Sequence, residues 1–206
     1  MTVNVSGQSS GAFDVGFASG TISGSGSSLT IGTSDIGADG TNVSITANGI
    51  TDLDVVSYGR GNYIDLGGGV NDLQTIAVSG VAPIYIDGIP TTVSAFTAAS
   101  ASGPVTLGID ASSNGNTALT GDSAQITGGA GFDTIRLDTN GTFATDLTSI
   151  EAIKFDGSAA TATVKATGMG SINTLTFSGN SSASVSGLQD QALTVNAILD
   201  GAGQQV

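Results

Sequence analysis

The sequence predicts an all-β protein, either a β-solenoid or a β-sandwich, and three features of its 206 residues lead to this prediction. The best helix formers are scarce, since Lys and Arg together total 4, Met counts 2 and Glu151 is the single glutamate. Glycine, which suits turns, contributes 32 residues. Hydrophobic residues still make up 39% of the chain, which is too many for a disordered acidic tail.

A further feature is a series of short apolar runs that recur about every ten residues between Gly, Asp, Asn and Ser turns. In chain order, the expected strands are Phe13–Phe17, Leu29–Ile31, Val43–Thr46, Leu53–Val56, Tyr63–Leu66, Thr75–Val78, Ile84–Ile86, Thr92–Phe96, Val105–Ile109, Thr134–Leu137, Ile150–Phe155, Thr163–Ala166, Thr174–Phe177, Ser184–Ser186 and Leu193–Ala197. Several alternate apolar and polar residues, which is typical of strands with one buried face. Strands this short cannot bury a core alone, so they must stack on neighbours.

No segment has a clear amphipathic helical pattern. Asp146–Ile153 could form a turn or two of helix, with Leu147 and Ile150 on one face. Leu188–Leu199 fits either a helix or a strand.

The domain organisation is predicted as an N-terminal β portion over residues 1–50, which could supply an assembly strand, followed by a repeat-like β portion over residues 51–206. One continuous domain is the alternative, because small residues are spread along the whole chain. Ser23–Ser28 and Thr97–Gly103 have the small, polar composition of linkers.

The formal charge of −13 excludes several classes of function. Nucleic acids and anionic membrane surfaces need clustered Lys and Arg, which four basic residues cannot provide. The chain has no His and no Cys, which excludes imidazole or thiolate metal sites and Ser-His-Asp or Cys-His catalysis. Oxygen ligands remain, from Asp, Asn and turn carbonyls, and these are the ligands of calcium.

Membrane insertion is not expected either, because no apolar stretch approaches the roughly 18 residues of a transmembrane helix. The first residues, MTVNVSGQSSG, lack the basic and apolar regions of a cleavable signal peptide. The chain could stay inside the cell, leave it by another route, or be a piece of a longer protein.

The most specific motif is GGAGFDTIR, over Gly128–Arg136. It matches the nonapeptide G-G-x-G-x-D-x-U-x at every fixed position. In that unit the glycines form turns that expose carbonyl oxygens, and the aspartate adds a carboxylate. The predicted calcium ligands are foremost Asp133 with the carbonyls of Gly129 and Gly131, then Asp122 and Asp138.

A degenerate copy of the motif lies in Gly59–Leu73, where Asn62 and Asn71 are nine residues apart. Tyr63 stands where the intact motif has its aspartate. Further candidate calcium ligands in and around this tract are Asn62, Asp65, Asn71 and Asp72. Calcium at such turns would offset the mutual repulsion of the many aspartates.

On these residues the chain resembles RTX-type calcium-binding β-roll proteins, and in particular RTX-related bacterial S-layer proteins. The segments Val70–Gly80, Thr92–Leu107, Ile126–Asp133 and Asp146–Phe155 are similar to the strand-and-turn phrases of such surface-layer sequences. The resemblance implies an extracellular protein of the bacterial cell surface, exported by type I secretion, that assembles in calcium into a lattice or filament. True β-rolls carry several tandem nonapeptides, whereas this chain has one full copy.

Other interpretations stand beside this one. Gly129, Gly131 and Asp133 could form an ordinary turn before a strand. An adhesin or ligand-binding β-solenoid module is the main functional alternative, with Thr-rich strands such as Thr161–Thr163 and Thr174–Thr176 as a flat binding face.

A polysaccharide-acting enzyme is the weakest alternative. Glycosidases need two carboxylates at a controlled separation, and a sugar site benefits from aromatic platforms, but the chain has no Trp and three Tyr. The four basic residues are interpreted as surface partners of the aspartates rather than catalysts: Arg60, Arg136, Lys154 and Lys165. No residue is assigned to catalysis or to an organic cofactor.

The sequence therefore predicts an extracellular, self-assembling structural protein, a surface-layer or filament subunit stabilised by Ca²⁺. Its expected partners are copies of itself and cell-surface polysaccharide. Exposed edge strands would join the copies, because they present unpaired backbone groups. Met1–Ser6 is a candidate donor strand.

Overall fold

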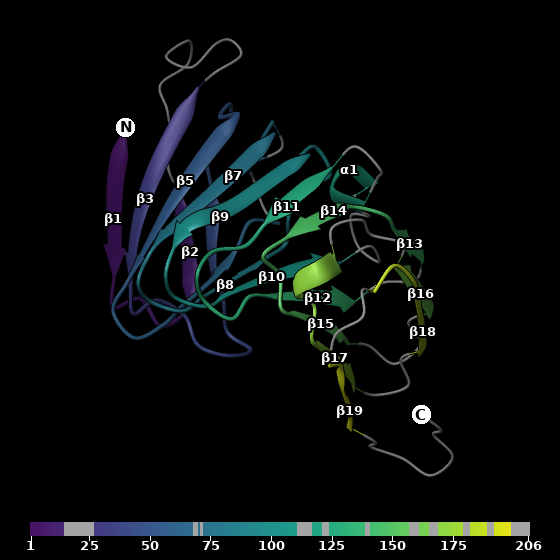
Figure 1. Ribbon diagram of the computed structural model, residues 1–206. Coiled ribbons are helices and arrows are strands. Elements are labelled where there is room, and N and C mark those ends of the chain that lie inside the picture. The colour runs from purple at the N-terminus through teal and green to yellow at the C-terminus, as the bar shows by residue number, and fades with distance from the viewer. Residues whose placement is uncertain are drawn as a thin grey trace.

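The computed structural model describes residues 1–14, 27–67, 70, 72–110, 117–120, 124–138, 141–156, 161–164, 169–178, 182–188 and 192–198. The chain winds into a β-solenoid in which successive coils add strands to long parallel sheets (Figure 1). Every ladder between named strands is parallel in the described part of the chain, which distinguishes a solenoid from an antiparallel sandwich. The all-β solenoid prediction is confirmed.

The strands form three sheets. Sheet A has seven strands, in the order β1 (Thr2–Ser6), β3 (Ser28–Ser34), β5 (Asp52–Tyr58), β7 (Thr75–Gly80), β9 (Ala95–Ala101), β11 (Gln125–Thr127) and β14 (Asp146–Thr148). Sheet B has nine, in the order β2 (Gly11–Asp14), β4 (Val43–Thr46), β6 (Asn62–Asp65), β8 (Ile84–Asp87), β10 (Val105–Asp110), β12 (Thr134–Asp138), β15 (Ala152–Phe155), β17 (Thr174–Ser178) and β19 (Thr194–Ile198). Sheet C has three, β13 (Gly141–Phe143), β16 (Thr161–Val164) and β18 (Ser182–Val185).

The core consists of apolar side chains that stack in register from strand to strand, and one line in each sheet shows this arrangement. The sheet A line is Leu29, Leu53, Ile76, Phe96, Ile126 and Leu147. The sheet B line is Val43, Ile64, Ile86, Leu107, Ile135, Ile153 and Leu175. Each of these side chains is at most 5% exposed. Their burial, at about 1.5–3 kcal/mol per side chain, is the main stabilising term of the fold.

The outer faces of sheets A and B explain why the strands alternate. Parallel sheets are usually covered on both faces and read as continuous apolar runs. Here only the inner face is covered, and in strands such as β4, β6 and β8 the residues between the core positions are half-buried. The period of two in the sequence therefore marks the inside and outside of the solenoid.

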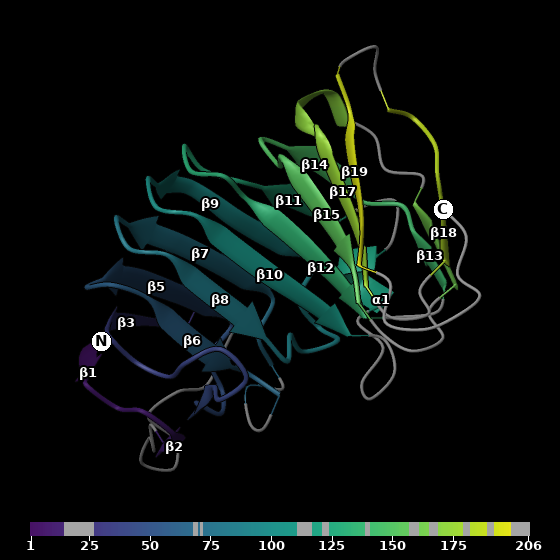
Figure 2. The same cartoon turned by 90° about the horizontal axis from the view of Figure 1, so that it is seen from below.

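The solenoid has two long sides in its N-terminal part and gains a third side further along. The short helix α1 (Thr117–Thr120) comes first on this side, with Leu119 fully buried. The amide of Ala144, just after β13, donates to the Thr120 carbonyl oxygen at 2.9 Å. Sheet C then continues this side of the solenoid, opposite the N-terminal end (Figure 2).

Some sequence-based expectations are wrong in detail. Asp146–Ile153 is not helical but holds β14 and the start of β15, and Thr97–Ala101 belongs to β9 rather than to a linker. A one-turn 3₁₀ helix, η1 (Met169–Ser171), lies beside the end of β14, and the Ser171 hydroxyl donates to the Ile150 carbonyl at 2.8 Å. The Thr-rich strands β16 and β17 lie in different sheets, so they form no common face.

Sheet A is continuous across the boundary predicted at residue 50, because β3 before it pairs with β5 after it over seven residue pairs. At the N-terminal end of this sheet, β1 pairs with β3 of its own chain. Of the helices in the described residues, none has the length and apolarity needed to cross a membrane.

Candidate functional site

Asp133, the foremost predicted calcium ligand, is 1% exposed in the turn before β12. Its Oδ1 accepts the Val105 amide of the preceding coil at 2.8 Å, and its Oδ2 accepts the Gly129 amide. The Glu151 carboxylate accepts the amide of Asp133 at 2.8 Å. The Asp133 carboxylate therefore fastens its coil to the preceding one through the hydrogen bond that it accepts from the Val105 amide.

Gly129 is required by close packing of the coils. A Cβ at this position would lie 2.3 Å from the Ala101 carbonyl oxygen and 2.6 Å from that of Ala98, both on the preceding coil. The glycines of the nonapeptide thus allow backbone to approach backbone.

The other predicted ligands are not brought together. Asp133 and Asp138 lie at opposite ends of β12, about 17 Å apart at 3.3 Å per residue. Asp72 is exposed in the turn before β7, and Asp122 and Asn71 lie outside the described residues. Within those residues, no group of three or more Asp, Glu, His or Cys side chains could hold a metal ion.

Asn62 and Asp65, at the two ends of β6, are engaged within the chain. The buried Asn62 amide donates to Ser57 Oγ at 2.7 Å and to the Tyr58 carbonyl at 2.9 Å, while its oxygen accepts the Ile36 amide at 3.3 Å. Asp65 accepts the Gly67 amide at 2.8 Å. The described residues thus do not assemble a calcium shell of six to eight oxygens, and calcium binding stays a prediction from the sequence.

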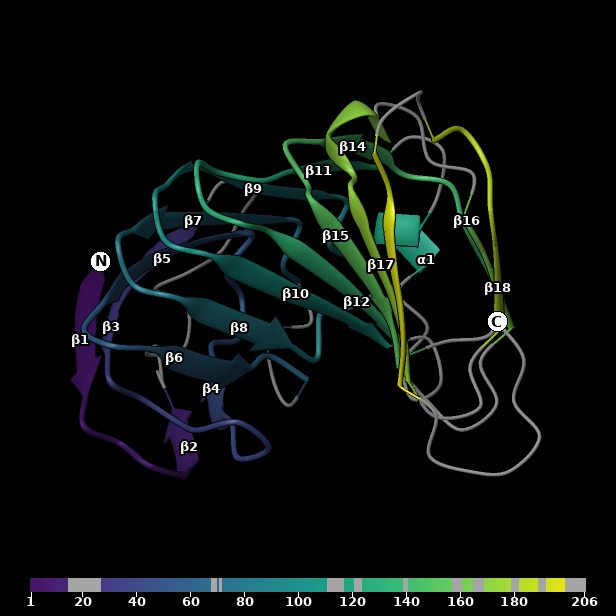
Figure 3. The same cartoon turned by 60° about the horizontal axis from the view of Figure 1, so that its bottom comes forward.

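A groove of about 860 Å³ lies on the outer face of sheet B. Its lining residues come from five neighbouring strands, β6, β8, β10, β12 and β15, which lie side by side in Figure 3. Its outward side chains are Tyr63 and Asp65 from β6, Tyr85 and Asp87 from β8, Thr106 from β10, Thr134 and Arg136 from β12, and Lys154 from β15. The turn residues Pro83 and Pro104 close one end of the strands.

This sheet B groove gathers residues that are rare in the chain. Three of the four basic residues line it, Arg60, Arg136 and Lys154, together with two of the three tyrosines. Four carboxylates accompany them, those of Asp39, Asp65, Asp87 and Asp156. The groove is therefore close to neutral although the chain carries −13.

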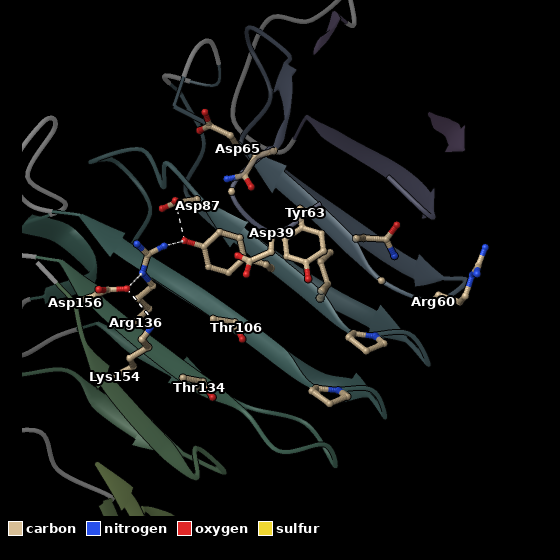
Figure 4. Close-up of a pocket in the computed structure, with 18 residues that line it drawn as sticks. Asp39, Arg60, Tyr63, Asp65, Asp87, Thr106, Thr134, Arg136, Lys154 and Asp156 are labelled. Carbon is tan, nitrogen blue, oxygen red and sulfur yellow. Dashed lines mark hydrogen bonds and ion pairs between the residues drawn. The ribbon is translucent and has the colours of Figure 1, made fainter. Parts of the chain in front are cut away.

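A polar network lies along one side of the groove (Figure 4). The Tyr85 hydroxyl donates to Asp87 Oδ2 at 2.8 Å and accepts a hydrogen bond from Arg136 Nη1. Arg136 Nε donates to Asp156 Oδ2 at 2.9 Å, and Lys154 Nζ lies 3.0 Å from the same oxygen. The Arg136 guanidinium also lies 5.7 Å from the centroid of the Tyr85 ring, within cation–π range.

The network shifts the pKa of its members. Burial, reinforced by the Asp87 carboxylate, raises the pKa of Tyr85. Burial opposes the Arg136 cation, but Tyr85 and Asp156 outweigh it and raise the pKa of the guanidinium. Burial likewise opposes ionisation of Asp156, yet the Ser178 hydrogen bond and the two cations lower the pKa of that carboxyl to about 2. All three groups keep their usual charge at neutral pH.

Gly108 makes this network possible. It stands opposite Arg136 on the neighbouring strand, in the row between Arg136 and Asp87. A Cβ there would lie 2.5 Å from Asp87 Oδ1 and 3.1 Å from the Tyr85 hydroxyl. The missing side chain leaves a dimple of about 40 Å³ over Gly108, room for one water or hydroxyl group.

Comparison with known proteins adds no relative. No family model matches the chain, and neither a curated protein nor a solved structure does. The resemblance to RTX-type and S-layer proteins rests on the quoted residues alone.

The groove escaped the sequence analysis because its members are far apart in the chain. Tyr85 and Arg136, which share a hydrogen bond, are separated by 51 residues. A signal was present: Arg136 and Lys154 each follow a residue of the sheet B core line and therefore face outward on adjacent strands. Without the strand register, the basic residues read as scattered surface charges.

Proposed function

We propose that the chain is a non-enzymatic structural subunit that associates end to end with copies of itself, at the cell surface as the RTX resemblance suggests. The observation that carries the proposal is β19, the last strand of sheet B among the described residues. β19 continues the sheet B core line, because Val195 stands in register on Leu175. Leu175 is 5% exposed, whereas Val195 is 47% exposed.

β19 also lacks the usual protection of an edge strand. Natural edge strands carry charges, prolines or bulges that prevent pairing with another chain. β19 reads TVNAI, with neither a charge nor a proline, and the preceding Leu193 is 40% exposed. A strand from a second copy would cover Val195 and satisfy the backbone groups of the edge.

The opposite end of sheet B offers the matching edge. β2 is its first strand, and Gly11 stands in register below Val43 in the core line. A junction of β19 with β2 of the next copy would place Val195 against Gly11, a large residue against a small one. β1, at the corresponding end of sheet A, is also uncharged, with the sequence TVNVS.

Charge opposes this association. Each copy carries −13, so two copies repel each other at low ionic strength. Association should therefore strengthen as salt screens the repulsion, and bound Ca²⁺ would have the same effect.

The test is sedimentation velocity over a range of protein concentration and salt. Val195→Lys should abolish the oligomers that the wild type forms, because it places a charge in the core line at the junction between two copies. Asn196→Lys is the matched control, since it adds the same charge to the same strand on its outer face. A wild-type chain that stays monomeric at high concentration in salt and in calcium would refute the proposal.

A further inference from the structure

We infer that the sheet B groove binds a linear, uncharged, hydroxyl-rich saccharide that lies across the strands. The inference is independent of end-to-end association, because the groove spans β6 to β15 whereas the proposed junction uses β19 and β2.

The shape of the groove fits a chain molecule. Its volume is about 860 Å³, within the range of sites that hold small ligands. It crosses five strands, and neighbouring strands are about 4.8 Å apart, so it is about 19 Å long. This length accommodates several sugar rings in a row.

Tyrosine rings supply the apolar part of the site. Tyr63 and Tyr85 stand opposite each other on β6 and β8, with ring centroids 6.1 Å apart and ring planes inclined by 46°. Both are half-buried, so their orientation is held by the sheet. The C–H face of a sugar ring can pack on such rings while its hydroxyls remain available to polar groups.

The polar groups of the groove can both donate hydrogen bonds to hydroxyls and accept hydrogen bonds from them. Asp65 and Asp87 accept hydrogen bonds, Arg136 and Lys154 donate them, and the threonine hydroxyls of β10 and β12 do either. The dimple over Gly108 adjoins Tyr85 and Arg136 and is the size of one hydroxyl group. A sugar hydroxyl, which both donates and accepts, can use all of these groups.

The charges favour an uncharged ligand. Arg136 and Lys154 are already paired with Asp156, and Asp87 already accepts a hydrogen bond from Tyr85. A polyanion would meet the −13 charge of the chain, and a polycation would meet the Arg136 and Lys154 cations. A neutral polymer exchanges hydrogen bonds with the groove without breaking these pairs.

The test measures binding of neutral hexasaccharides, β-1,4-linked glucose and β-1,4-linked N-acetylglucosamine, by titration calorimetry, with oligogalacturonate as the acidic comparison. Tyr85→Ala should weaken binding of a neutral hexasaccharide at least about tenfold. Tyr58→Ala is the matched control, because Tyr58 is exposed and lies outside the groove, and it should bind like the wild type.

A second variant keeps the network intact. Thr106→Trp fills the middle of the groove without removing any member of the network, and it should also weaken binding about tenfold or more. Circular dichroism checks that each variant is folded. The inference is overturned if neither neutral hexasaccharide binds, if only oligogalacturonate binds, or if binding survives Thr106→Trp in the folded protein.

Discussion

Sheets A and B share the same coils and the same kind of interior, yet their outer faces differ in chemistry. A middle row of sheet A reads Thr30, Asp54, Ala77, Thr97, Thr127 and Thr148 from strand to strand. The corresponding rows of sheet B hold the tyrosines, arginine and lysine of the groove. A hollow of about 320 Å³ on sheet A is lined by small residues such as Ser79 and Ala99.

The comparison separates what folding needs from what function uses. The interior lines of both sheets are set by stacking and consist of apolar residues. The outer faces are free of that constraint, and small polar residues are sufficient there, as sheet A shows. The bulky and charged residues of sheet B are therefore the ones that call for a functional account.

The largest effect is expected from breaking the shared interior. Leu53→Ala in sheet A and Ile86→Ala in sheet B each remove a fully buried side chain and should each lower the free energy of unfolding by about 3 kcal/mol. Urea denaturation measures both. A cost several times larger in one sheet than in the other would contradict the equivalence of the two interiors.

A smaller loss is expected for Asp133→Asn, because the new amide group cannot accept both backbone hydrogen bonds. The free energy of unfolding should fall by about 2 kcal/mol. Asp54→Asn, at an exposed position of sheet A, should change it by less than about 0.5 kcal/mol. The role of Asp133 in joining coils predicts the same loss in millimolar calcium and in excess EDTA, whereas a loss seen only in calcium would assign Asp133 to a metal.

The sheet B network should make stability depend on pH at both extremes. The pKa of Asp156 is lowered from 3.8 to about 2. The contribution of Asp156 to the free energy of unfolding is therefore complete above pH 4 and is lost as the pH falls toward 2. We expect this loss to be about 1 kcal/mol, since the carboxylate remains partly in water. Asp156→Asn should flatten this part of a stability profile measured by urea denaturation, and an unchanged profile would contradict the network.

At alkaline pH, stability is lost as the pH rises rather than as it falls. The pKa of Tyr85 is raised above its usual value of 10. The contribution of Tyr85 to the free energy of unfolding is therefore complete below pH 10 and is lost as the pH rises above 10. Tyr85→Phe should remove this alkaline loss, whereas Tyr58→Phe should leave it in place.

The smallest effect is expected from Gly108→Ala. The added methyl group displaces the flexible ends of Asp87 and Tyr85, which can move, so stability should change by less than about 1 kcal/mol. The alkaline loss assigned to Tyr85 should nevertheless shrink. Gly32→Ala is the counterpart in sheet A, where the methyl group meets the side chain of Asn4, and it should leave the pH profile unchanged.

The sequence located most of the strands, although not β11, β13 or β14, and it did not show which strands pair. Alternation located β4, β7 and β17 because it reports directly which residues face the core. It could not tell a solenoid from a sandwich, since both have half-buried strands. The nonapeptide correctly marked a turn before β12, but the Asp133 carboxylate is held by the amide of Val105, which lies 28 residues earlier on the preceding coil. The groove depends on register, which no local pattern contains.

The claim that sheet B, and not sheet A, carries the binding face is tested most directly by NMR titration of the isotope-labelled protein with a neutral β-1,4-linked hexasaccharide. We predict that the amide signals of Tyr63, Tyr85, Thr106 and Thr134 shift, while those of Thr30, Asp54 and Thr97 do not. Shifts confined to sheet A, or equal on the two sheets, would contradict it.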